Sequence, residues 1–159
     1  MKKRIFAAFL TGYVAFIAIY GFITWALTSL KITAYGRFVS TFFKGRKPDE
    51  AKAFIEANKG VFEQMLPEAT RFSNIVITPS VSLILGIIVG LIIASRQKFM
   101  GSVWALTVAA PLGILFWVKS MGEPDKAMYL ILMLAASAIG GYIGNLIASK
   151  TYAKAQGGI

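Results

Sequence analysis

The chain lacks the two side chains that most often carry out chemistry near neutral pH. It contains no cysteine and no histidine, which removes disulfides, thiolate metal sites, the usual haem or zinc ligand and the usual proton shuttle. The remaining acids are seven carboxylates: Asp49, Glu50, Glu56, Glu63, Glu68, Glu123 and Asp125. Acid–base or metal chemistry would have to be built from these side chains, so their positions along the chain decide whether it is available.

Long uncharged stretches separate the charged residues. The 159 residues are 57% hydrophobic and only 15% charged, where a soluble domain carries about 25% charged residues. A helix needs roughly 20 residues to cross a bilayer core, and four uncharged stretches are long enough. We therefore predict an all-α membrane protein, a single transmembrane domain over 1–159, with spans at about 5–30, 73–95, 99–118 and 127–149. Every carboxylate lies outside these spans.

The ends of the predicted spans carry the expected residues. The basic segment Met1–Arg4 precedes the first span, as in a secretory signal, but the apolar run is far longer than the roughly 7–15 residues of a signal and no Ala-x-Ala site follows it. We predict a retained anchor. Aromatic residues typical of membrane interfaces lie near the span ends: Trp25, Phe72, Phe99, Trp104, Trp117 and Tyr129.

The distribution of basic residues predicts how the chain is oriented in the membrane. One side of the membrane receives Met1–Arg4, Arg96–Lys98 and Lys150–Ile159, which contain Lys and Arg but no acid. The other side has more basic residues, spread over two longer loops that hold every carboxylate. A raw count favours the second side as cytoplasmic, whereas the first helix, with its basic flank, usually dominates. We expect both termini in the cytoplasm and the chain in a bacterial inner (plasma) membrane.

Residues 31–72 predict an extramembrane amphipathic helical hairpin between the first two spans. Its first helix places one apolar face at helical spacing: Ile32, Tyr35, Phe38, Val39, Phe42 and Phe43. Residues 44–47 break the pattern, Pro48 starts a second helix, and that helix is expected to end near Pro67. Phe54, Phe62 and Met65 form its apolar face and are our candidates for contact with a partner. The simpler alternative is two helices that rest on the membrane or on the spans.

The second and fourth spans carry small residues at every fourth position: Ser82, Gly86, Gly90 and Ala94, and Ala136, Gly140, Gly144 and Ala148. This GxxxG-type spacing lets another backbone approach closely, so these residues are our candidates for helix packing. The stretches Gly86–Arg96 and Gly140–Lys150 share one pattern, which indicates either two tandem helical hairpins or a chance similarity.

Three further features lie in the spans. The first span has an aromatic seam on one face: Phe6, Phe9, Tyr13, Phe16 and Tyr20. We interpret this seam as packing into a groove of the second or fourth span. The alternative is that it lines a groove for a pigment, a quinone or a lipid. Pro111 interrupts the third span and predicts a kink. Asn145, the most polar residue of the spans, predicts an interhelical hydrogen bond.

Two function classes remain. We favour a non-enzymatic integral membrane subunit or assembly partner of a larger complex, docking through the small-residue grooves. The alternative is a small homo-oligomeric channel or transporter for an uncharged or lipid-like solute, with a path near Pro111. Proton-coupled transporters usually hold an acid or histidine at membrane depth, and none is present here.

The same residues set the expected partners. We expect no catalytic, cofactor-binding or metal-binding residue. The net charge is +10, and the basic residues lie at the ends of the predicted spans, where Lys and Arg contact lipid headgroups. We therefore expect anionic lipid headgroups and other integral membrane subunits as partners, and no nucleic acid.

Overall fold

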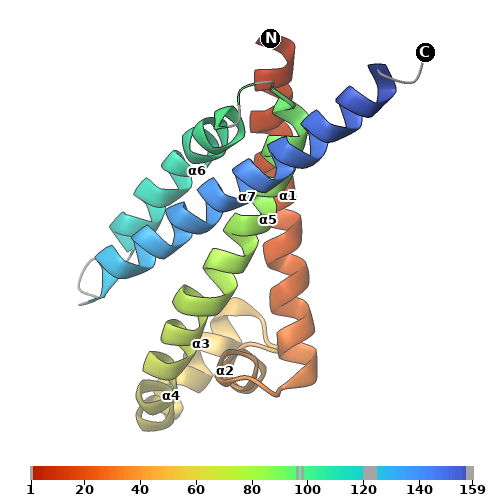
Figure 1. The fold of residues 1–159 in the computed structure, drawn as a ribbon. Coiled ribbons are helices and arrows are strands. Elements are labelled where there is room, and N and C mark those ends of the chain that lie inside the picture. The colour runs from red at the N-terminus through yellow and green to blue at the C-terminus, as the bar shows by residue number, and fades with distance from the viewer. Residues whose placement is uncertain (1, 96, 98, 120–124, 157–159) are drawn as a thin grey trace. The chain divides into compact units, whose positions relative to one another are not determined.

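The computed structural model describes residues 2–95, 97, 99–119 and 125–156, and these residues form helices and short connections without a strand (Figure 1). The helices are α1 (Lys2–Leu30), α2 (Ala34–Phe42), α3 (Pro48–Ala57), α4 (Lys59–Phe72), the π-helical η1 (Ser73–Ile77), α5 (Thr78–Ile93), α6 (Met100–Lys119) and α7 (Lys126–Gln156). The prediction of an all-helical chain is confirmed.

Within the described residues, four helical segments are long and apolar enough to cross a membrane: Ile5–Leu30, Lys59–Ile93, Met100–Val118 and Lys126–Thr151. The second one begins earlier than predicted. Helix continues from α4 through η1 into α5, whereas the sequence predicted an end near Pro67. Pro67 lies inside α4 on an exposed position, and it costs the helix one backbone hydrogen bond.

The described chain divides into two compact units: residues 1–18 with 78–159, and residues 19–77. In the first unit α7 packs along both α5 and α6 (Figure 1). A buried core joins α5 and α6 to the start of α1, and consists of Ala8, Leu85, Val89, Ile93, Ala105 and Val108.

The start of α1 enters this core through small residues. A Cβ at Gly12 would lie 3.0 Å from Val108 Cγ1 and 3.3 Å from Leu85 Cδ1, and the Tyr13 hydroxyl donates to the Val108 carbonyl at 3.1 Å. The predicted aromatic seam is therefore divided. Phe9 and Phe16 flank the core, whereas Phe6 is 71% exposed. The partners in this unit are α5 and α6, because α6 brings Val108 to the face that holds Gly12.

The second unit is the hairpin together with the end of α1. Lys31 ends α1 with φ at 53°, and Thr33 caps α2 by accepting a hydrogen bond from the Gly36 amide at 3.0 Å. Gly36 lies so close to the Leu27 carbonyl that a Cβ would collide with it. This contact places α2 against α1.

The second turn of the hairpin forms where the sequence predicted a break. Gly45 has φ at 77°, a conformation that favours glycine. α3 then begins at Pro48, and the Lys47 amide donates to Glu50 Oε2 at 3.0 Å. α3 ends at Asn58, whose side-chain amide donates to the Phe54 carbonyl at 2.9 Å. The hairpin thus holds three helices where two were expected.

Candidate helix-packing and docking surfaces

The glycines of α5 and α7 lie at the crossing of these two helices. A Cβ at Gly86 would collide with the Ser137 carbonyl oxygen and lie 2.8 Å from the Gly141 nitrogen. A Cβ at Gly140 would collide with the Leu83 carbonyl oxygen and lie 3.0 Å from the Ile87 nitrogen. These neighbours are backbone atoms, which no rotamer change can move. Glycine is therefore the residue that lets these helices reach their observed separation.

The contacts at this crossing obey a local two-fold symmetry. Gly140 stands 54 positions after Gly86, and its neighbours Leu83 and Ile87 stand 54 positions before Ser137 and Gly141, the neighbours of Gly86. In an isologous contact the same residues of each partner face one another. The two similar stretches of sequence therefore meet each other as equivalent surfaces.

The next pair of glycines repeats this relation. Gly90 faces Gly141 and Asn145, and Gly144 faces Ile87 and Leu91, again at an offset of 54. Contact positions rise together along α5 and α7, so the two helices run parallel where they cross.

The other members of the two stripes occupy different environments. Ser82 and Ala148 are buried, and Ala136 is half-buried. Ala94 lies just beyond the end of α5 with φ at 45°, so it ends the helix rather than extending the stripe. The backbone that approaches the stripe glycines belongs to the chain itself, which leaves these positions occupied within one molecule.

α6 meets α7 through a second close contact that our sequence analysis missed. Cβ atoms at Gly101 and Gly141 would each collide with the other's carbonyl oxygen. The Ser102 hydroxyl donates to the Ala138 carbonyl at 2.8 Å, and the buried Ser137 hydroxyl donates to the Ala105 carbonyl at 3.2 Å. The available signal was the pair of small residues at the start of the third span, which we did not match to Gly141.

Asn145, for which the sequence predicted an interhelical hydrogen bond, bonds to the segment between α5 and α6. Its Oδ1 accepts from the Ser95 amide at 2.7 Å, and its Nδ2 donates to the Gln97 carbonyl at 3.1 Å. Both partners lie between α5 and α6, and the side chain is 1% exposed. α7 is thereby bonded to the connection of the other two helices of its bundle.

The apolar face of the hairpin lies inside the second unit. Phe54, Phe62 and Met65 pack against the buried Phe38 and Phe42, and the rings of Phe42 and Phe62 meet edge to face at 5.1 Å between centroids. These three side chains are our candidates for contact with a partner, and packing within this unit leaves each of them half-buried. Their contact with a partner stays a prediction.

Pro111 lies inside α6, which is helical on both sides of it. Pro111 and Thr107 are both exposed, and the Thr107 hydroxyl donates to the Val103 carbonyl at 2.8 Å. The kink itself stays a prediction.

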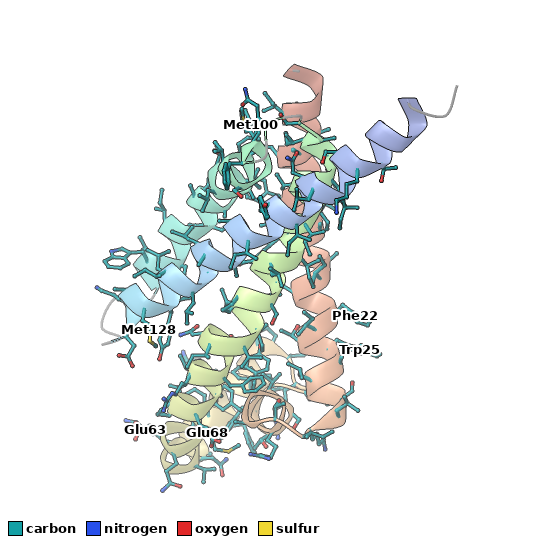
Figure 2. The ribbon with its side chains drawn as sticks, in the orientation of Figure 1. Phe22, Trp25, Glu63, Glu68, Met100 and Met128 are labelled. Carbon is teal, nitrogen blue, oxygen red and sulfur yellow. The ribbon has the colours of Figure 1, made fainter. Side chains whose placement is uncertain are left out.

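The least covered apolar surface belongs to α1. Of the most apolar 18-residue window of each span, 11% is buried in α1 and 44% in the segment that contains α5. In the second unit, Phe22 and Trp25 are 65% and 66% exposed, and both side chains project outward from α1 (Figure 2). Their ring centroids are 6.0 Å apart. A Cβ at Gly21, on the same face, would meet nothing within 4 Å.

Among the described residues, no cluster of three carboxylates is placed to hold a metal ion. No protein-family model, no curated protein and no solved structure matches the chain.

Proposed function

We propose that this protein is a non-enzymatic integral membrane subunit, or assembly partner, of a larger membrane protein complex. The observation that supports this most directly is the open face of α1, which we call the α1 face and define as Gly21, Phe22 and Trp25. The α1 face takes over the role that the small-residue stripes had in the sequence prediction, because those stripes are occupied by α5 and α7.

Gly21 is the informative residue of the α1 face. Glycine inside a helix costs about 1 kcal/mol relative to alanine, and the glycines at the α5–α7 crossing offset that cost by allowing close backbone contact. A Cβ at Gly21 would meet nothing within 4 Å among the described residues, so no close backbone contact offsets the cost there. In membrane helices glycine allows another helix to come near, and exposed aromatic rings beside such a point are common anchors of interfaces. A partner's transmembrane helix fits this arrangement.

Replacement of Gly21 by leucine tests the proposal. We expect Gly21→Leu to lower the amount of co-purifying membrane protein at least about tenfold, since a central interface anchor is worth about 2 kcal/mol or more. The chain should stay in the membrane fraction, because insertion depends on the four apolar helices.

A matched control is Gly60→Leu, which changes another helical glycine with open space around it, near the start of α4. It should leave the partner bound. Equal recovery of partner with both variants, or a wild-type chain that purifies alone from mild detergent, would refute the proposal.

We also propose a bacterial inner membrane location with both termini in the cytoplasm. The chain has no cysteine, so single cysteines report orientation directly. Lys52 and Thr151 are both exposed. In intact cells with a permeable outer membrane, Lys52→Cys should react with an impermeant maleimide, and Thr151→Cys should react only after lysis. The opposite pattern would invert the topology.

The alternative function, a small homo-oligomeric channel or transporter for an uncharged or lipid-like solute, is favoured by one observation. Pro111 and Thr107 are exposed on α6, so a path near Pro111 would run between copies of the chain. A reconstituted homo-oligomer that carries flux and loses it in Pro111→Ala would select this function over the first.

A further inference from the structure

An apolar groove runs along the surface between α6 and α7. Its volume is about 410 Å³, within the range of small-molecule sites. One face of α6 and two leucines of α7 line it: Leu106, Ala110, Gly113, Ile114, Trp117, Leu130 and Leu134. All of these residues belong to the first unit.

Gly113 lines this groove where α6 packs against α7. It is buried, and a Cβ there would lie 3.2 Å from Leu130 Cδ1 and 3.3 Å from the Met133 methyl carbon. Ile114 and Trp117 form the rim and are 66% and 37% exposed. Every residue that lines the groove is apolar.

One end of the groove carries a positive charge. Lys126, the first residue of α7, holds its ammonium group 4.7 Å from the ring centroid of Trp117. Tryptophan and lysine are the residues that mark the headgroup layer at the end of a membrane helix. Asp125 is exposed beside Lys126. The charged end and the apolar body of the groove together match an amphiphile.

We propose that this groove binds one phospholipid, with an acyl chain along α6 and the phosphate at Lys126. The groove's length favours a lipid over a helix of another protein. From Leu106 to Trp117 α6 rises about 16 Å, close to half of the roughly 30 Å hydrocarbon core. One acyl chain has the depth of one leaflet, whereas a transmembrane helix would need a groove of twice this length.

The site should accept a zwitterionic or an anionic headgroup, since Lys126 supplies a positive charge and Asp125 a negative one. The phosphate contact is the feature that every phospholipid shares. The site needs only that the chain spans the membrane, so it stands or falls independently of any partner at the α1 face.

Native mass spectrometry of the full chain tests the site. The protein is purified in mild detergent, exchanged into vesicles of phosphatidylethanolamine and phosphatidylglycerol, re-extracted, and washed with detergent until bulk lipid is gone. We expect the wild type to retain one phospholipid per chain. Ala110→Phe should abolish retention by filling the groove, and Lys126→Gln should reduce it about fivefold, the contribution of one basic residue near the headgroups.

Two controls match these changes. Ala135→Phe alters an exposed alanine of α7 that does not line the groove, and Lys150→Gln removes an exposed charge from the other end of α7. Both should retain lipid as the wild type does. Circular dichroism of Ala110→Phe should match the wild type, because Ala110 is exposed.

Three results would overturn the proposal. A wild-type chain that retains no phospholipid after washing has no such site. Equal retention in all five proteins assigns the lipid to the general surface. A co-purified polypeptide lost only in Ala110→Phe, without any retained lipid, assigns the groove to a protein helix.

Discussion

A single methyl group at Gly86 should measurably destabilise the first unit. Gly86→Ala places a Cβ against the Ser137 carbonyl oxygen and 2.8 Å from the Gly141 nitrogen. Both atoms belong to the backbone of α7, so α5 and α7 must separate. Overpacking of a close contact costs about 1–3 kcal/mol, and fixed backbone neighbours argue for the upper end.

The same substitution also improves the helix propensity at this position. Alanine is favoured over glycine inside a helix by about 1 kcal/mol. The net loss for Gly86→Ala is then about 2 kcal/mol, which for a chain of this size lowers the thermal midpoint by about 4–8 °C. Thermal unfolding of the purified protein in one detergent, followed by circular dichroism, measures this shift.

Gly21→Ala is the matched control, since it makes the same change where a Cβ would meet nothing within 4 Å. It should keep the helix-propensity gain and raise the midpoint by up to about 2–4 °C. The local two-fold also predicts a similar loss for Gly140→Ala, and a double variant that costs less than the sum because the helices are already apart. A Gly86→Ala midpoint equal to that of Gly21→Ala would refute the assigned contact.

Two other substitutions test the polar and aromatic contacts. Asn145→Leu removes the hydrogen bonds to the Ser95 amide and the Gln97 carbonyl. It should lower the free energy of unfolding by about 1 kcal/mol, measured as a lower thermal midpoint. An unchanged midpoint would mean that water or another group satisfies both partners. Phe42→Ala empties the core of the hairpin unit, where Phe42 is 0% exposed, and should cost about 3–5 kcal/mol. Phe43→Ala, at a 42% exposed residue, should cost far less, and hydrogen exchange of the α3 amides distinguishes the two.

Local sequence signals predicted the helices well. The absence of charge marked the four apolar segments because charged side chains are costly at membrane depth. Pro48, followed by the acidic residues Asp49 and Glu50, marked the start of α3. Gly45 marked the break between α2 and α3. Each of these signals acts within a few residues, so no knowledge of the tertiary structure was needed.

The surfaces that these helices present were harder to predict. In a membrane helix the outward and inward faces are both apolar, so hydrophobic periodicity does not say which face a neighbour covers. The stripe of α5 suggested a groove for a backbone but not that α7 supplies it. Phe54 and Phe62 looked equally suited to a partner and to α2, because burial within the chain and burial against a partner require the same side chains.

The contacts of the glycines now separate two kinds of experiment. Substitution of Gly86 or Gly140 disturbs the crossing of α5 and α7, so any partner lost with it reflects an altered fold and says little about docking. A Cβ at Gly21 would meet nothing within 4 Å, so substitution by leucine should not destabilise the described chain and should, if anything, add helix propensity. A partner lost in Gly21→Leu, in a protein whose thermal midpoint is no lower than that of the wild type, therefore identifies the α1 face as the docking surface.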